Sequence, residues 1–454
     1  MAQSETNFVH AADLSELKEE GRKLINKNGQ AIALFYHEGD VQAVDNRCPH
    51  MGFPLTEGTV EDGILTCHWH HARFELACGD TFDPWADDLP TYPVKVEDGK
   101  VLVKPKQQRD KPPAEHWQDR LETGLEENLR LVLAKSAIGL EQSNVDYTVP
   151  FRKGIAFGTE YRQDGWGRGL TIHSLLANLR PDLQEKDRKR AMYIGLNRVA
   201  NNTSGEPPKF EQPAFENKNL SKTRLKSWFR DNVDVRDRDG AERVLRTAIQ
   251  DLTEEEVADI LFTTATDHIY INTGHTLDFI NKAFESLDHI GWDHADQVLP
   301  SLVPSLTDAD WGEENSQWRQ PIDIAELLFD TYDELPALID AGKSQSWDEP
   351  DSFIDTLLSD DPHAIVDTLR EAIRNGATPA ELAKRVAYAA AIRIAQFSTG
   401  NEFSDWDTVH HTFTYANAVH QATQRTEAWE LYRGVFDAAM NVYLDRFLNT
   451  PPAQ

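Results

Sequence analysis

The sequence has few cysteines, with three among 454 residues. So few thiols exclude the disulfide scaffold of a small secreted domain, and they predict a reducing, cytoplasmic location. The isolated Cys78 is expected to be a small buried apolar residue. The sequence also lacks any run of roughly 18 uncharged apolar residues, which a membrane-spanning helix requires. Its N-terminal segment has no basic region followed by an apolar run, as a secretory signal would.

Positive charge is scarce as well. Lys and Arg total 46 residues against 76 Asp and Glu, and the net charge is −30. Nucleic acids and anionic membranes bind to basic patches, so we expect neither as a partner. Two roles for the acidic surface stay open: solubility alone, which is the commoner one, or attraction of a basic redox partner. The length predicts two or three domains with substantial cores.

Two short metal-binding patterns are present near the N-terminus. Cys48 and His50 form a Cys-x-His pair, and Cys67 and His70 form a Cys-x-x-His pair. Two thiolates and two imidazoles are the ligands of a Rieske [2Fe–2S] cluster, with the two Cys on one iron and the two His on the other. A structural zinc site uses Cys and His at similar spacings and is the alternative.

Residues 5 to 104 resemble the Rieske domains of ring-hydroxylating oxygenases and of Rieske-type ferredoxins. The resemblance is carried by C-P-H-M-G-F-P-L from Cys48, by C-H-W-H-H-A-R-F from Cys67, and by the lead-in A-L-F-Y-H-E-G-D-V-Q-A-V-D-N-R. The sequence departs from the pattern at His71, where such domains usually have Gly, and at Cys78, where a Thr-Gly turn is common. The resemblance implies a [2Fe–2S] cluster that receives electrons from a reductase or a ferredoxin.

The chain changes character after residue 104. Before it, residues 31–36, 41–44, 63–66, 73–76 and 92–103 are short and β-rich, with hairpin turn signals at 38–40, 61–63 and 97–99. After it, apolar residues recur at helical spacing. The expected fold is therefore α+β and multidomain: a small antiparallel β Rieske domain (1–104), a Pro-rich linker (105–116) and a large, mostly α-helical domain (117–454) in which we expect the catalytic site.

An iron–sulfur cluster transfers single electrons, so the acceptor is an external protein or a second centre, namely an additional iron or another redox cofactor in the helical domain. The inward-facing stripes of the predicted helices contain imidazoles, so histidines are the first candidates. The candidate second-site residues are His268, His275, Glu285, His289, His411 and His420.

These candidates fall into two groups. Helical spacing predicts that His268, on a helix over 253–271, and His411 and His420 point inward, where a hydrogen-bonded core histidine is the simpler interpretation. In contrast, His275, Glu285 and His289 share one polar stripe of a predicted helix over 275–290, together with Asp278 and Lys282. That stripe is either a metal-binding face or a solvated face.

Two family patterns bear on the same residues. The iron site of ring-hydroxylating oxygenases has two His and one carboxylate, which would correspond here to His289, His294 and either Asp437 or Asp445, although Ser286 stands where an upstream Asp or Asn is usual. Segments 273–289 and 406–420 resemble questin-oxidase-like helical proteins, which oxidise aromatic polyketides. That resemblance implies site roles for His268, His275, His411 and His420.

The leading hypothesis from the sequence is an oxidoreductase. Its cluster would feed electrons to a redox or oxygen-activating site in the helical domain, where a small, mostly apolar organic substrate is oxidised, and a neighbouring subunit of a homo-oligomer would complete the path in one version. The alternative is a non-enzymatic Rieske electron carrier, whose helical domain is a docking or oligomerisation module and whose histidines are structural.

Overall fold

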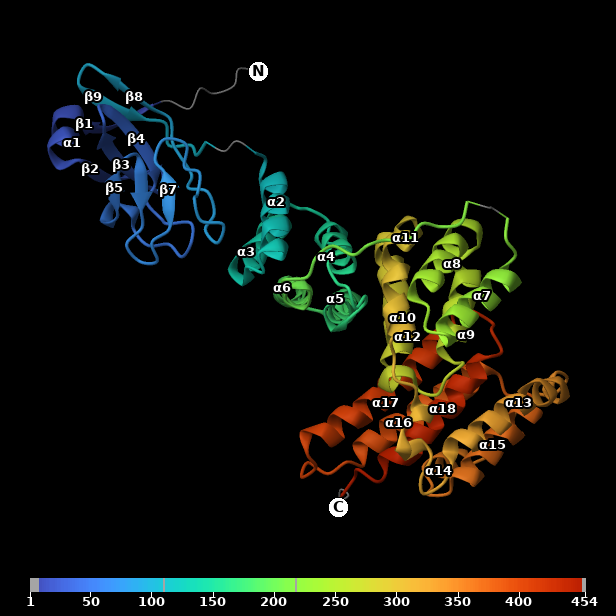
Figure 1. The fold of residues 1–454 in the computed structure, drawn as a ribbon. Coiled ribbons are helices and arrows are strands. Elements are labelled where there is room, and N and C mark those ends of the chain that lie inside the picture. The colour runs from blue at the N-terminus through green and yellow to red at the C-terminus, as the bar shows by residue number, and fades with distance from the viewer. Residues whose placement is uncertain (1–7, 109–110, 217–218, 451–454) are drawn as a thin grey trace. The chain divides into compact units, whose positions relative to one another are not determined.

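The computed structural model describes residues 8–108, 111–216 and 219–450, which form two compact units (Figure 1). The first unit extends to Pro150 and includes Glu185–Ala200, and the second contains Phe151–Gln184 and the chain from Asn201 onward. This grouping differs from the predicted boundary at 105–116. Helix α2 (Pro113–Glu126) begins within the predicted linker, and both it and α3 (Arg130–Gln142) belong with the strands.

The strands of the first unit form three antiparallel sheets of three strands each, in the orders β1-β9-β8, β2-β3-β4 and β5-β6-β7. Their bounds are β1 (Val9–Asp13), β2 (Arg22–Lys27), β3 (Gln30–His37), β4 (Asp40–Asp45), β5 (Thr59–Glu61), β6 (Ile64–Thr66), β7 (Arg73–Glu75), β8 (Val94–Glu97) and β9 (Lys100–Val103), with one helix, α1 (Leu14–Glu20), between β1 and β2. The small antiparallel β domain predicted from the sequence is confirmed.

Tight hairpin turns explain why these short strands pair as they do. Four hairpins close through two-residue loops that end in Gly, at 28–29, 38–39, 62–63 and 98–99, and both loop residues have positive φ in every case. That is the type I′ geometry, whose twist matches the twist of the flanking strands. Glu38 adopts a φ of +48° in one of these turns, where Asn, Asp or Gly is usual.

The core of the first unit surrounds the two predicted thiol ligands. Cys48 and Cys67 are 3% and 1% exposed, and they pack with Phe35, Leu65 and Phe74 in one buried cluster. A second buried cluster joins Leu17 of α1 to residues of the sheets β1-β9-β8 and β2-β3-β4. Both sulfurs therefore lie in the hydrophobic core and not at the surface.

The helices of the second unit confirm the mostly α-helical C-terminal region. Their bounds, with α4 and α6 shared between the units, are α4 (Thr148–Glu160), α5 (Arg168–Asn178), α6 (Glu185–Thr203), α7 (Lys222–Asp234), α8 (Arg238–Asp251), α9 (Glu254–Ala265), α10 (His275–Ile290), α11 (Ala295–Val298), α12 (Val303–Thr307), α13 (Ile324–Gly342), α14 (Phe353–Leu357), α15 (Pro362–Arg374), α16 (Pro379–Ala395), α17 (Phe403–Ala422) and α18 (Leu431–Asp445). The buried helix α18 packs against α13, α15, α16 and α17. In the described part of the chain, no helix combines the length and the apolar character needed to cross a bilayer.

Polar side chains attach the hairpin of α2 and α3 to the loop between β7 and β8. Arg120 of α2 donates to the backbone carbonyls of Pro84 and Ala86, both at 2.7 Å. His116 lies 2.9 Å from the carboxylate of Asp87, and Arg120 lies 3.5 Å from the same carboxylate. Because Arg120 is mostly buried, these bonds are shielded from water and hold the helical hairpin in place.

This attachment predicts the effect of Arg120→Met. The substitution leaves two carbonyls without their donor and removes one of the two partners of Asp87, which we expect to cost about 1–3 kcal/mol. Amide hydrogen exchange measured by mass spectrometry should then become faster across α2 and α3, while the matched variant of the exposed Arg130, Arg130→Met, leaves it unchanged. Equal exchange rates in the two variants would contradict this account of how the hairpin is attached.

Candidate metal centre

Two loops with the same backbone hydrogen bonds carry the predicted ligands. In the first loop, Cys48–Phe53, the N–H of Cys48 donates to the carbonyl of Phe53 (2.9 Å) and the N–H of Gly52 donates to the carbonyl of Cys48 (2.7 Å). The second loop, Cys67–Ala72, repeats both bonds at the same offsets, at 2.8 and 3.0 Å. The two loops are therefore equivalent turns, each beginning at a cysteine.

The fifth residue of each loop must adopt a left-handed backbone conformation. Gly52 has a φ of +86° and His71 a φ of +63°. Glycine reaches this region without strain, whereas a residue with a Cβ pays roughly 1–2 kcal/mol. The backbone is therefore strained at His71, where related domains usually have Gly, although the two loops otherwise match.

The four predicted ligands meet where the two loops face one another. The buried thiols of Cys48 and Cys67 contact each other, and the rings of His50 and His70 pack edge to face with their centroids 4.8 Å apart. Burial, followed by the contact with Cys67, raises the pKa of the Cys48 thiol to about 11, against backbone N–H groups of His50 and Met51 that favour the thiolate. Stable thiolates at this position need a nearby cation, which a bound metal provides. The residues present thus fit a metal centre with two sulfur and two nitrogen donors.

The two imidazoles have different surroundings. His50 is half-buried and lies against the indole of Trp85 (centroids 4.7 Å apart), whereas His70 is exposed beside Trp69. Burial, then His70 and Lys135, lower the pKa of His50. The neutral imidazole is the form that binds a metal, so this environment favours ligation.

The comparisons with known proteins cover this part of the chain. The sequence profile of the Rieske [2Fe-2S] domain matches residues 7–93. The ferredoxin component of the naphthalene 1,2-dioxygenase/salicylate 5-hydroxylase systems of a Ralstonia species is 34% identical over 99 residues, which are 22% of this chain and 95% of that protein. The chain belongs to the Rieske [2Fe–2S] family.

Two further relatives are of the same kind. The ferredoxin component of the Pseudomonas putida naphthalene 1,2-dioxygenase system is 30% identical over 97 residues, which are 21% of this chain and 93% of that protein. The ferredoxin component of the Xanthobacter autotrophicus alkene monooxygenase system is 31% identical over 102 residues, which are 22% of this chain and 84% of that protein. The Rieske [2Fe–2S] cluster predicted as the cofactor is confirmed, and it replaces the zinc alternative. The likeness of the helical segments to questin-oxidase-like proteins is not tested by these matches.

A cleft of about 720 Å³ adjoins the first loop of the Rieske domain. Cys48 and His50 line one side, and Arg120 and Lys135 of the helical hairpin line another. Cys78 also lines it and is exposed, so our expectation of a buried residue was wrong. The thiol sits in the turn after β7, where its backbone N–H donates to the carboxylate of Glu75 (2.6 Å).

The structure also shows that Asp87, Asp88 and His116 border this cleft with their ligand atoms close together, and they are the only three such side chains in the described ranges that could share a single metal ion. The sequence-based candidates in the helical unit do not include them. Asp87 is already engaged by His116 and Arg120, which lower its pKa although its burial acts in the opposite direction. We therefore interpret these residues as part of the hairpin attachment.

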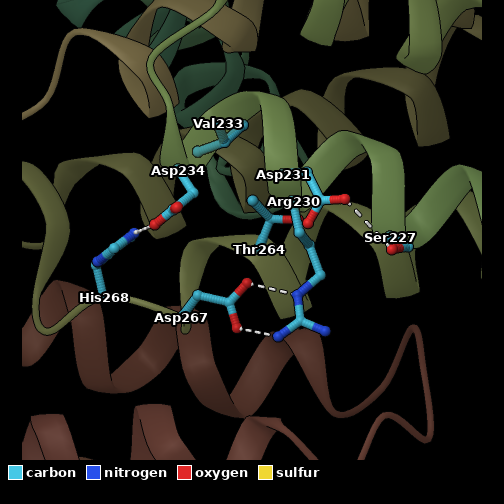
Figure 2. Close-up of a pocket in the computed structure, with 8 residues that line it drawn as sticks. All are labelled: Ser227, Arg230, Asp231, Val233, Asp234, Thr264, Asp267 and His268. Atoms are coloured by element: carbon cyan, nitrogen blue, oxygen red, sulfur yellow. Dashed lines mark hydrogen bonds and ion pairs between the residues drawn. The ribbon is translucent and has the colours of Figure 1, made fainter.

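Among the predicted second-site residues, His268 lies in a pocket of its own. Helix α9 ends at Ala265, so His268 is in the following turn and not on a helical stripe, which corrects our prediction. Its Nδ1 lies 2.8 Å from Oε1 of Glu313, and its ring stacks on Trp311 with centroids 3.6 Å apart. Figure 2 shows the other ring nitrogen pointing toward Asp234, 3.7 Å away, across a polar pocket of about 380 Å³.

His275 and His411 are brought together from two helices. Their rings, from α10 and α17, pack edge to face with centroids 4.4 Å apart. Burial, followed by the neighbouring His411, lowers the pKa of His275 to about 4, so this imidazole is neutral at physiological pH. His411 also lies 3.9 Å from the carboxylate of Asp407.

Glu285 and His289 belong to a polar interface between helices. The side-chain amide of Asn178 in α5 donates to Glu285 (2.5 Å), and its oxygen lies 2.8 Å from Nε2 of His289. Lys282 forms an ion pair with Glu285 at 2.9 Å and is buried. The polar stripe of α10 is thus hydrogen-bonded to α5, so the solvated-face interpretation was wrong for its central residues.

The other two predictions concern residues late in the chain. Helical spacing places His420 on one stripe with Val409, Phe413 and Ala416. Val409 and Ala416 are buried, but His420 is only half-buried and Phe413 is 38% exposed, so the stripe faces inward only in part. The candidate triad of His289 and His294 with Asp437 or Asp445 is not assembled: within residues 8–108, 111–216 and 219–450 these side chains form no group able to share one ion.

Asp437 instead forms the centre of a buried tyrosine cluster that the sequence did not reveal. Its carboxyl is hydrogen-bonded by the hydroxyl of Tyr332, by the hydroxyl of Tyr415 (3.0 Å) and by the backbone N–H of Tyr270 (3.3 Å). Burial raises the pKa of Asp437 to about 7, although these hydrogen bonds favour the charged form. Burial raises the pKa of Asp445 to about 7 as well.

The strain at His71 predicts that His71→Gly stabilises the Rieske domain. Glycine removes a left-handed penalty of roughly 1–2 kcal/mol and adds some unfolded-chain entropy, so a net gain of up to about 1 kcal/mol is expected. The temperature at which the visible cluster absorbance is lost should rise. The matched control is His68→Gly in the same loop, at an exposed position without a positive φ, where no gain is expected; an equal gain there would refute the strain argument.

The tyrosine cluster predicts a pH dependence of stability. Asp437 keeps its proton in the folded protein up to about pH 7, whereas an aspartate in an unfolded chain loses it near pH 4. The folded state therefore binds more protons between these values, and the free energy of unfolding falls as pH rises, by up to about 1.4 kcal/mol per pH unit for each such group.

Asp437→Asn should remove one of these contributions. Urea unfolding followed by far-UV circular dichroism at pH 5, 6 and 7 is expected to show a slope smaller by about one bound proton, with Asp445 still contributing. The exposed Asp333 of α13 provides the control, because Asp333→Asn should leave the slope as it is. An unaltered slope in the Asp437 variant would show that this carboxyl does not titrate as argued.

Proposed function

We propose that this protein transfers single electrons through a Rieske cluster held by Cys48 and Cys67 on one iron and by His50 and His70 on the other. The observation that carries the proposal is the pairing of two buried thiols with two facing imidazoles on two equivalent loops. When bound, the cluster supplies a one-electron couple whose potential is higher than that of all-cysteine clusters, because two neutral ligands replace two charged ones.

The protein side chains then decide where electrons pass. His70 is exposed and lies beside Trp69 (52% exposed), and Met51 of the first loop is 55% exposed. His50 is half-buried, and its ring packs against Trp85. We therefore propose that electrons enter and leave on the His70 side, from a reductase and to an oxygenase-type acceptor, by analogy with relatives that are named as ferredoxin components of oxygenase systems.

A second candidate function is oxidation of a small organic substrate in the helical unit. The contact between His275 and His411 favours it. These two imidazoles come from different helices, and burial keeps His275 neutral, so together they could bind a metal or transfer a proton. In that case the helical unit would hold an additional iron or another redox cofactor. The carrier role is the better supported of the two, since it rests on the complete four-donor set.

The ligand assignment predicts the outcome of substitution. Anaerobically purified protein should contain about two irons and two sulfides per chain and show the visible and electron-spin-resonance signals of a reduced Rieske cluster. Cys67→Ala and His70→Ala should each abolish those signals. Cys78→Ser and His68→Ala change neighbouring residues of the same two types outside the donor set, and should preserve them.

The same measurements discriminate the two functions. Iron in excess of the cluster that disappears in His275→Ala or His411→Ala would favour the oxidising site in the helical unit. A colourless protein that holds one zinc, or full signals in both ligand variants, would refute the proposed cluster.

A further inference from the structure

Lys135 connects the helical hairpin to the first loop of the Rieske domain. Its ammonium group donates to the backbone carbonyl of Pro49 and to that of His50, the latter at 2.7 Å. These two carbonyls belong to the short segment that joins the proposed ligand Cys48 to the proposed ligand His50. A side chain of α3 thereby fixes the backbone that sets the spacing of a sulfur and a nitrogen donor.

Two features of the hairpin hold Lys135 in this place: the packing of its helices and the hydrogen bonds of Arg120. Its two helices pack through fully or nearly fully buried side chains, including Leu121 and Leu125 of α2 and Leu133 of α3. Arg120 ties α2 to the carbonyls of Pro84 and Ala86. Lys135 is therefore positioned by the fold and does not depend on its own flexible chain alone.

The positive charge of Lys135 is not cancelled by a close carboxylate. Across the described residues, no Asp or Glu lies within ion-pair distance of its Nζ, and the nearby Asp87 is paired with His116 and Arg120. Lys135 is also half-buried, so water and salt screen its charge less than that of a surface lysine. Its field therefore acts on the adjacent metal centre.

We propose that Lys135 is a positioning residue that raises the reduction potential of the Rieske cluster and makes the helical hairpin a part of the electron-transfer centre. Reduction adds one electron to the cluster, supplied by the donor protein or by a chemical reductant, and no bond forms or breaks. A nearby fixed cation stabilises the added negative charge, and hydrogen bonds and charges around a cluster are known determinants of its potential. The inference rests on the proposed ligand set, because it places the cation beside the His50 ligand.

The test is a spectroelectrochemical titration of the complete protein. Lys135→Met removes the charge and both donors while keeping the side-chain volume, and should lower the equilibrium constant for reduction about tenfold, which is 59 mV for a one-electron couple. Lys135→Arg keeps a charged donor and should stay within about threefold of the wild type. Lys111→Met removes the same charge from an exposed lysine that lines the same cleft and pairs with Asp119, and should change the constant little.

A further variant distinguishes the effect of the Lys135 charge from an effect of changed loop geometry. Lys135→Gln keeps an amide donor for the carbonyls without the charge, so it gives the same comparison if the Met variant loses its cluster. The proposal is supported if the reduction potential of Lys135→Gln lies below that of the wild type at both low and high salt. A potential equal to that of Lys111→Met in both neutral variants overturns it. A wild-type protein without the Rieske signals would overturn the ligand assignment itself, which is a different result.

Discussion

Everything in the first unit depends on holding two buried sulfurs next to each other without exposing them to water. Unpaired thiolates in a hydrophobic core are costly, so the chain can keep them only where a cationic metal compensates. The fold meets this requirement at the second loop by ending a strand next to the sulfur: β6 ends at Thr66, one residue before Cys67, and β7 begins at Arg73. The matched backbone hydrogen bonds of the two loops accompany sulfurs that are both buried, while the imidazole of His70 is exposed and that of His50 is half-buried.

The local features of this centre could be predicted from the sequence because they depend on neighbouring residues. Gly-containing two-residue turns encode type I′ hairpins, and ligand spacings of one and two residues encode the loops. The departure at His71 was visible as well, since its strain arises from a backbone angle that one residue must adopt. Lys135 was not predictable in the same way. It meets the first loop across 86 positions of sequence, and nothing in the helical pattern of α3 marks one lysine as different from the others.

The errors in the helical unit have one physical origin, which is that periodicity does not identify the partner of a helix face. The polar stripe of α10 has the same sequence pattern whether it faces water, a metal or another polar helix. The deciding partner, Asn178, lies 107 positions from Glu285. Likewise, the apolar periodicity around His268 continues past the point where α9 ends at Ala265. In both cases tertiary contacts, and not local preference, determined the environment of the residue.

The asymmetry of the two imidazoles restricts how the cluster can exchange electrons. A Rieske centre with both histidines equally exposed would offer two routes for an approaching partner. Here Trp85 packs on the ring of His50 and Lys135 donates to the backbone carbonyl of the same residue, while His70 is exposed to solvent. Because Lys135 is half-buried, its charge acts more strongly on the cluster than an exposed lysine would, since charges interact more strongly where water is partly excluded. The hairpin would thus help to set the energy of the electron that the cluster carries, so changes in α2 and α3 should alter redox behaviour even though neither helix contains a ligand.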